Sequence, residues 1–459
     1  MGLIQNLTHI CNVILGSILN GDGCATKKTC NLDNNIDENV GVASNTPIDI
    51  DNDLEYCDDD YEEADSTNDD AEQFAGYIDK ANVEEYLKDL RQRADSGETA
   101  AQTELGKHLL WGHIIPRDID ESTHLFRQAA EQGDDVGQCL LGMAYVNGDG
   151  VPKDHNEAFK WLKKAADQNN ALALKALGDY YATGTVVQQN YDEAVRLWLK
   201  AAELGYGNAM SSLAFHYAEH IGDKQEATKW FFKACRYGDE MATAVLMVTF
   251  NQDSLGGKQG NDPQSQKEAL SPDDEVIERF LGYVERTNIA EYLDDLRRRA
   301  NADDITAQTE LGGFLLNGTV IPHDVEEAMR LFASAAKQGN AEAQWQLGRG
   351  YKYGAGVPEN QDEAFKWFKK SAEQDYPPAL NTLGNYVVHG MSTKQDFDEA
   401  ARLWRKAADL GNSEGMFNLA YNYYANIVVD KHEATKWFFK AYLNGHDLSA
   451  SILKNALER

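Results

Sequence analysis

The sequence lacks the short motifs that mark the common enzyme classes. It contains no GxSxG nucleophile motif, no phosphate-binding P-loop and no HExxH zinc motif. Its six cysteines show no CxxC or other zinc-type spacing. We therefore expect no cofactor, and free thiols in a reducing, cytoplasmic compartment. The cysteines are Cys11, Cys24, Cys30, Cys57, Cys139 and Cys235.

Long apolar runs are also missing, which argues against a transmembrane segment. The N-terminal segment 1–27 is apolar, but its run is too short to span a bilayer and no basic residue precedes it. Leu3, Leu7 and Ile10 begin a helical spacing, which predicts an amphipathic helix. We expect residues 1–20 to dock on a partner or to contact a membrane surface, and an atypical export signal is the alternative.

Basic residues are scarce as well. The chain has 43 lysines and arginines against 75 acids, a net charge of −32, and no base lies between Lys28 and Lys80. So acidic a chain repels phosphate backbones, which argues against nucleic acid or an anionic membrane as its main ligand. The charge fits a basic protein partner, or solubility alone. Residues 28–72 have few large apolar side chains, so we expect an acidic disordered tail there.

What the sequence does contain is a repeat. A small residue, three further residues and a Leu-Gly pair or a close variant recur at intervals of 36 within each of two groups. A fixed period of this length is typical of solenoids. The matching segments begin at residues 101, 137, 173 and 209, and again at 307, 343, 379 and 415.

Each repeat is predicted to form two helices, A and B. Helix A carries the Leu-Gly pair, and a turn such as GDGVPKD at 148–154 follows it, with glycines that permit positive φ. Helix B is predicted to begin near Asn156 or Asp362, whose side chains can cap it. Glycines such as Gly133 and Gly339 are expected to end helix B in the left-handed conformation.

This pattern, with EAFKWLKKAA in helix B, resembles the Sel-1-like repeat, a relative of the tetratricopeptide repeat. The resemblance implies an all-α fold, an α/α superhelical solenoid of 36-residue helix-turn-helix repeats duplicated into two arrays. We expect the arrays at 73–250 and 276–459, with a flexible linker at 251–275. Whether the arrays stack as one superhelix or are hinged stays open. The repeats at 208–240 and 413–447 lack the GxGVP turn, as suits the end of a stack.

The two arrays are copies of one another. The stretch EATKWFFKA occurs at 226–234 and again at 433–441, in helix B of the last full repeat of each array. We interpret it as a packing unit in which Trp230 and Trp437 are buried rings and the lysines are solvated. Burying such a ring contributes about 2–3 kcal/mol, which accounts for the repetition without any chemistry.

The strongest enzymatic candidate is HYAEH at 216–220, which fits the H-x-x-E-H zinc pattern with His216, Glu219 and His220. A metal held there would be zinc. The second array, however, has asparagines at the two histidine positions, and so short a match arises easily by chance. We therefore expect no metal site.

In solenoids of helical pairs, A helices line extended concave binding surfaces. The positions just after the Leu-Gly pair are therefore candidates for partner contacts, and we expect exposed aromatic rings among them to serve as anchors. These candidates are Lys107, Met143, Asp179, Tyr180, Phe215, His216, Arg349, Lys352, Asn385, Tyr386 and Tyr421.

The resemblance implies a non-enzymatic protein–protein interaction scaffold or adaptor that binds one or more proteins on the concave faces of the two arrays. One alternative is an immunity protein that binds and neutralises a toxin, because some proteins with this repeat resemble that class. The other is a zinc-dependent hydrolase that uses the HYAEH residues.

Overall fold

The computed structural model describes residues 78–256, 284–318, 320–425 and 430–458. Within these residues all the regular structure is helical and no strand occurs, as predicted. None of these helices is long and apolar enough to cross a membrane. The predicted amphipathic segment 1–27 and acidic tail 28–72 lie outside the described residues.

The helices alternate as A and B partners along the chain. In the first half they are α3 (Lys80–Asp95), α4 (Thr99–Trp111), α5 (Ile119–Glu131), α6 (Asp135–Asn147), α7 (His155–Asp167), α8 (Ala171–Thr183), α9 (Tyr191–Glu203), α10 (Gly207–His216), the π-helix η1 (Tyr217–Ile221), α11 (Lys224–Arg236) and α12 (Glu240–Gly256). In the second half they are α14 (Arg286–Asn301), α15 (Ile305–Asn317), α16 (Val325–Lys337), α17 (Ala341–Tyr353), α18 (Gln361–Ala372), α19 (Pro377–His389), α20 (Phe397–Asp409), α21 (Ser413–Ala425), α22 (Lys431–Leu443) and α23 (Asp447–Glu458). Because α12 continues to Gly256, the first residues of the predicted linker 251–275 are helical, and its remainder lies outside the described residues.

The B helices begin at side-chain caps that lie slightly upstream of the predicted ones. The side chain of Asp154 accepts a hydrogen bond from the backbone N–H of Glu157 at 3.1 Å, so Asp154 rather than Asn156 caps α7. At α18 the cap is Asn360 rather than Asp362. Each cap binds an N–H group that has no partner within its own helix.

The predicted glycines do end the B helices. Gly133 has a φ of 98° and Gly339 a φ of 97°, both in the left-handed region. Side chains with a Cβ adopt this conformation at a cost, whereas glycine does not. The sequence spacing therefore located these helix ends correctly.

Each Leu-Gly pair places its glycine against a large side chain of the following B helix. A Cβ added to Gly178 would lie 2.5 Å from Nε1 of Trp198, so α8 and α9 approach this closely only because residue 178 is glycine. The other pairs are Gly106 with Phe126, Gly142 with Leu162, Gly312 with Phe332, Gly348 with Phe368 and Gly384 with Trp404.

In EATKWFFKA the tryptophan is not the deepest ring. Trp437 is buried as predicted, but Trp230 is only half-buried, while the next residue, Phe231, has no exposed surface. The lysine that follows is not simply solvated, because Lys233 Nζ lies 4.1 Å from the ring centre of Trp230. The deepest packing position is therefore one residue further along than the sequence predicted.

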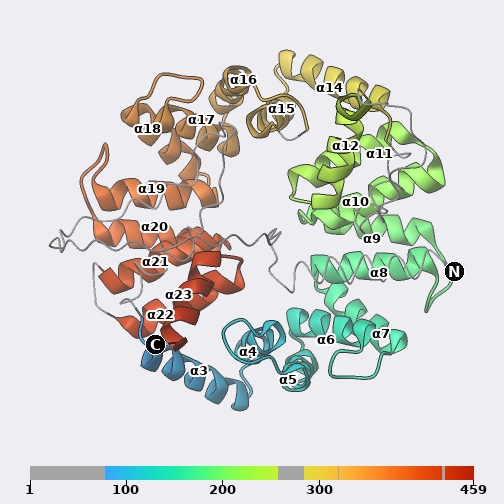
Figure 1. Cartoon of the computed structure of the whole chain (residues 1–459), viewed down its shortest axis with the longest axis vertical. Coiled ribbons are helices and arrows are strands. Elements are labelled where there is room, and N and C mark those ends of the chain that lie inside the picture. The colour runs from blue at the N-terminus through green and yellow to red at the C-terminus, as the bar shows by residue number, and fades with distance from the viewer. Residues whose placement is uncertain (1–77, 257–283, 319, 426–429, 459) are drawn as a thin grey trace, which may run out of the picture.

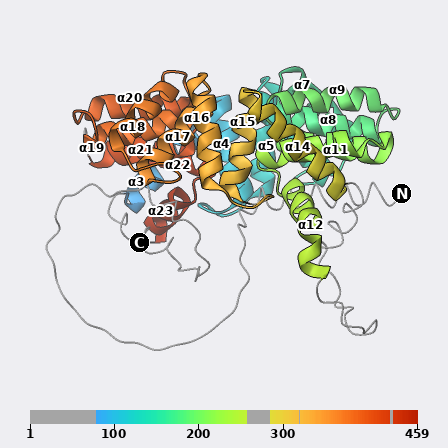
Figure 2. The same cartoon turned by 90° about the horizontal axis from the view of Figure 1, so that it is seen from above.

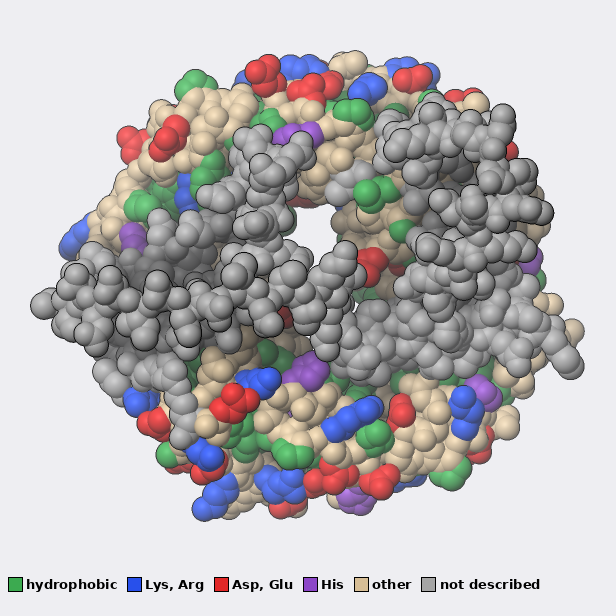
Figure 3. All heavy atoms as spheres, viewed as in Figure 1, with side chains coloured by type: hydrophobic (Ala, Val, Ile, Leu, Met, Phe, Trp, Pro, Cys, Tyr) green, Lys and Arg blue, Asp and Glu red, His purple; other side chains and the backbone are tan. Residues whose placement is uncertain are grey.

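The helix pairs close into a ring (Figure 1). The chain runs once around, and α3 lies beside α22 and α23, so the two ends of the described chain meet. Seen from the side, α12 and α23 project from the same side of the ring (Figure 2). The space-filling view shows an opening through its middle (Figure 3). The two arrays thus form one closed superhelix, which answers the question that the sequence left open.

Two equivalent contacts connect the halves. We name the contact of α11 and α12 with α14 and α15 the central joint, and the contact of α22 and α23 with α3 and α4 the terminal joint. At the central joint the ring of Phe232 stacks on Tyr292, and at the terminal joint Phe439 stacks on Tyr86, each with centroids 4.4 Å apart. Both phenylalanines are the second Phe of EATKWFFKA. The duplicated string therefore serves the joints as well as the packing within its own repeat.

The hydrophobic core continues through both joints. One cluster of buried residues extends within 139–347 and crosses the central joint. A second combines residues of 78–125 with residues of 372–456, across the terminal joint. Since each cluster takes apolar side chains from both halves, the halves share their core through both joints, and the second cluster is complete only in the closed ring.

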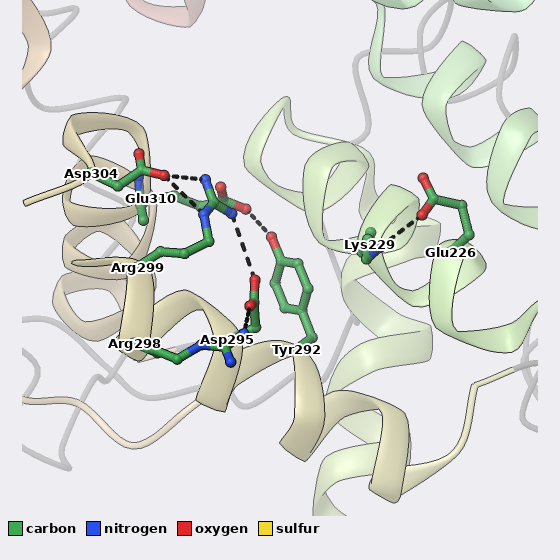
Figure 4. A network of polar contacts seen from close by, with 9 residues as sticks. Glu226, Lys229, Tyr292, Asp295, Arg298, Arg299, Asp304 and Glu310 are labelled. Carbon is green, nitrogen blue, oxygen red and sulfur yellow. Dashed lines mark hydrogen bonds and ion pairs between the residues drawn. The ribbon is translucent and has the colours of Figure 1, made fainter. Parts of the chain in front are cut away.

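A carboxylate holds the tyrosine of each joint. At the central joint the hydroxyl of Tyr292 donates to Glu310 on α15 (Figure 4). On the same helix as Tyr292, the guanidinium of Arg299 bonds to Asp304, with 2.8 Å between Nε and Oδ2. At the terminal joint the hydroxyl of Tyr86 donates to Glu104 on α4. The stacked tyrosines are thereby fixed to the A helix that follows them.

Candidate protein-binding surface

The predicted contact residues occupy equivalent places on the A helices, but they differ in exposure. Tyr180 and Tyr386, which the sequence interpretation treated as exposed anchors, are 7% and 0% exposed. The hydroxyl of Tyr386 donates to Oε1 of Gln361 at 2.6 Å, and the hydroxyl of Tyr180 lies 2.9 Å from Nδ1 of His155. These tyrosines therefore tie an A helix to the preceding B helix, and their exposure was predicted wrongly. Met143 and His216 are buried as well.

Three further candidates have structural contacts. The indole N–H of Trp198 donates to Asp179 at 3.1 Å. In the second half Asn385 accepts from the indole of Trp404 at the same distance. Because a buried indole N–H needs an acceptor, this position serves the tryptophan beside it.

The third of these is Phe215. Its ring packs edge-on against the buried Phe231, with centroids 5.1 Å apart. Phe215 is half-buried, so it contributes chiefly to the packing of α10 on α11.

The other four candidates keep half-exposed side chains, and two of these lie on one face of α17. Arg349 lies over the ring of Trp345 at 4.7 Å, and Lys352 lies over the ring of Tyr353 at 4.8 Å. Residues 345, 349, 352 and 353 are spaced as i, i+4, i+7 and i+8, which places them on the same side of a helix. We name these four side chains the α17 face. The remaining half-exposed candidates are Lys107 and Tyr421.

The α17 face has no counterpart in the first half. The equivalent positions of α6 carry Cys139, Met143, Val146 and Asn147, of which the first two are buried. In contrast, Tyr353 is 39% exposed. The repeat pattern predicted the two cations of this face as contact residues but not its two rings. The signal that would have found them is an aromatic residue beside each cation in one copy of the duplication only.

The HYAEH segment spans the end of α10 and the π-helix η1. The rings of His216 and His220 are 5.5 Å apart, and Nε2 of His220 is 3.9 Å from Glu219. His216 packs against the ring of Tyr191 at 5.2 Å. Across the described ranges, no group of three or more histidine, cysteine, aspartate or glutamate side chains is placed to hold a metal ion. The described geometry therefore gives the zinc hypothesis no support.

The chain matches the model of the Sel1 repeat family. The matched segments are residues 99–134, 136–170, 171–206, 209–239, 305–340, 341–376, 377–412 and 413–446. These segments agree with the A–B helix pairs of the structure, beginning with α4 and α5 and ending with α21 and α22. No curated protein matches the chain.

Several solved structures are similar. A protective antigen of uropathogenic Escherichia coli with an SLR fold is 29% identical, has a TM-score of 0.36, and the match covers 79% of this chain and 73% of that one. A Sel1 repeat protein from Oxalobacter formigenes is 25% identical, with a TM-score of 0.32 and coverage of 78% and 86%. An immunity protein from Pseudomonas aeruginosa is 15% identical, with a TM-score of 0.24 and coverage of 56% and 74%. Superpositions with such TM-scores support no argument about function. The family segments, in contrast, cover more than half of the chain, and the protein belongs to the Sel1 repeat family.

Proposed function

We propose that this protein is a non-enzymatic interaction scaffold and that the α17 face is its principal contact with a partner protein. Sel1 repeats mediate protein–protein interaction. The observation that carries the finer proposal is the pair of cation–aromatic contacts on α17, Arg349 with Trp345 and Lys352 with Tyr353, on one half-exposed helix face.

The chemistry of this face fits a protein interface. Aromatic rings and arginine are enriched where proteins bind each other, and aromatic rings bury much area at little cost in side-chain entropy. Trp345 is already held in place, since its indole N–H donates to the hydroxyl of Thr382 at 3.2 Å. A ring fixed before binding costs less entropy to immobilise in a complex. Arg349 and Lys352 favour contact with acidic side chains of the partner, and the rings then supply the specific contacts.

A charge reversal on this face tests the proposal. Wild type and an Arg349→Glu/Lys352→Glu variant are used as baits in extracts of the native cells, and captured proteins are identified by mass spectrometry. The matched control is Lys163→Glu/Lys369→Glu, which makes the same charge change at exposed positions of α7 and α18. Circular dichroism establishes that all three proteins are folded.

The captured partner is then purified and its affinity for each bait is measured by calorimetry. We expect the control to bind like wild type and the α17 variant to bind at least tenfold more weakly. Equal affinity of the two variants would rule out the α17 face as the contact. If the partner proves to be a toxin whose activity one equivalent of the protein blocks, the scaffold proposal gives way to the immunity alternative.

A further inference from the structure

The A helices of the two joints carry different residues at one equivalent buried position. At the central joint Phe314 packs edge-on against Phe232, with centroids 5.1 Å apart. The equivalent residue at the terminal joint is His108, whose ring packs edge-on against Phe439 at 5.0 Å and stacks on Tyr442 at 5.7 Å. His108 is 1% exposed, and neither of its ring nitrogens has a hydrogen-bond partner among the described residues. A polar ring without a partner thus occupies the place that a phenylalanine fills in the other joint.

A buried imidazole without partners destabilises the closed joint relative to phenylalanine, because its nitrogens lose the hydrogen bonds that water would make. The loss increases when the ring is protonated, since a cation is much more costly to bury than a neutral ring. Both losses are relieved if α22 separates from α4 and water reaches His108.

We propose that the terminal joint is a pH-sensitive latch, which opens reversibly in mildly acidic solution while the central joint stays closed. This proposal needs no partner protein and is independent of the scaffold function. Opening would separate Phe439 from Tyr86 and turn the ring into an open superhelix that is still joined at Phe232 and Tyr292.

The direction of the pH dependence follows from burial. Burial, and to a smaller extent the charge of Lys107, lowers the pKa of His108 from its ordinary 6.5 to about 3 in the closed joint. In the open joint water restores the ordinary pKa. The free-energy difference that favours the closed joint is therefore greatest above pH 6.5, where His108 is neutral in both forms. This difference shrinks as the pH falls towards 3. Lowering the pH from 7.5 to 5.0 should raise the equilibrium constant for opening of the terminal joint roughly 30-fold.

The other titratable groups around His108 do not reproduce this change. On α3, Tyr86 has a raised pKa because of burial, and on α22 burial raises the pKa of Tyr442 to about 12, so both stay neutral from pH 5 to 7.5. Glu104 on α4, which accepts from Tyr86, has a counterpart in Glu310 at the central joint. His113, which follows α4 and approaches Tyr442 with centroids 6.2 Å apart, is exposed on the surface.

Ion pairs also distinguish the joints. Within the described ranges one ion pair crosses each joint, Lys224 with Glu285 at 2.5 Å and Lys431 with Asp79 at 3.2 Å. A further ion pair links the halves near the central joint, because Arg236 on α11 reaches Glu342 on α17 at 2.6 Å. The corresponding residues near the terminal joint are Leu443 and Val136, which cannot form an ion pair. The terminal joint is therefore the one we expect to open.

Hydrogen exchange measured by mass spectrometry tests the latch on the full chain. Protection is compared at pH 7.5 and 5.0 after correction for the intrinsic exchange rate, in peptides from α3 and α22 and in peptides from α14 and α11. Peptides from α8 and α19, in the middle of each half, report any general loss of stability. We expect protection to fall roughly 30-fold at the terminal joint alone.

Two exchanges between the joints make the test reciprocal. His108→Phe, which installs the residue of the central joint, should abolish the pH effect, and Phe314→His should create a pH effect at the central joint. A His108→Phe protein that keeps the wild-type pH response would overturn the proposal. The proposal would also be overturned if protection of the wild-type terminal joint were the same at pH 7.5 and 5.0. A Phe314→His protein whose central joint shows no pH dependence would overturn it too, and this test does not require that His108→Phe folds.

Discussion

The rings of Phe439 and Tyr86 are stacked with centroids 4.4 Å apart, and this contact joins the last full repeat of the chain to its first described helix. Phe232 and Tyr292 make the same contact between the halves. Four aromatic side chains, two from the duplicated EATKWFFKA and two from the helix that opens each array, thus lie at the centre of ring closure.

Truncating these phenylalanines should open the joints one at a time. We expect Phe439→Ala to destabilise the terminal joint and Phe232→Ala to destabilise the central joint, each by about 3–5 kcal/mol. This is the usual cost of deleting a buried aromatic ring. Urea unfolding followed by tryptophan fluorescence, together with hydrogen exchange in α3 and α14, measures the effect. Loss of protection in α14 but not α3 after Phe439→Ala would contradict this assignment.

Adjacent glycines of α15 should respond in opposite directions to alanine. A Cβ on Gly312 would lie 2.9 Å from Cε1 of Phe332, so Gly312→Ala should destabilise the protein by about 1–3 kcal/mol. A Cβ on Gly313 would meet no atom of the described residues within 4 Å, so Gly313→Ala should stabilise the protein by about 0.5–1 kcal/mol through helix propensity. The unfolding temperatures of the two variants, compared with wild type, measure these effects. Equal changes in the two variants would show that Gly312 has no packing role.

Asp179, which accepts the hydrogen bond of the Trp198 indole, should tolerate replacement by asparagine but not by leucine. We expect Asp179→Leu to cost about 1–3 kcal/mol, because a buried N–H loses its partner. Asp179→Asn should be nearly neutral, since Asn385 plays this role for Trp404 in the second half. Chemical denaturation of both variants checks the prediction. Equal losses in the two would instead point to the ion pair of Asp179 with Lys175, at 2.8 Å, as the important contact.

Cys139 should be unreactive in the folded protein. Burial raises the pKa of its thiol to about 12, so at pH 8 almost none of it is the reactive thiolate. Iodoacetamide labelling at pH 8, mapped by mass spectrometry with and without denaturant, should modify Cys139 only after unfolding. The half-buried Cys235, whose pKa burial also raises, should react slowly in the folded state. Labelling of Cys139 at the same rate with and without denaturant would show that it is not buried.

The repeat fold could be predicted because its signals are local. The Leu-Gly pair and the glycine stops recur with a fixed period, and each acts within one helix pair. Ring closure could not be predicted, because it depends on the sum of the small rotations between successive repeats along the whole chain. One local feature of the sequence indicated the joints. Phe232 and Phe439 are apolar at a helix position that carries the exposed lysines Lys163 in α7 and Lys369 in α18.

The binding surface was harder to predict than the fold. The rule that residues after Leu-Gly are exposed was wrong for Tyr180 and Tyr386, because both reach the preceding B helix. It included Arg349 and Lys352 of the α17 face, but not the rings beneath them. Sequence spacing identifies which residues share a helix side, whereas the neighbouring helices decide how much of each remains exposed.

Closure also changes how this stack should come apart. In an open solenoid the outermost repeats have one neighbour each, so they fray first and usually need polar capping units. Here the end repeats cover each other, as the core cluster shared by residues of 78–125 and 372–456 shows. Melting any single repeat of the closed form breaks two interfaces at once. The described ring therefore has no frayed boundary from which loss of structure can spread until one joint has first been broken.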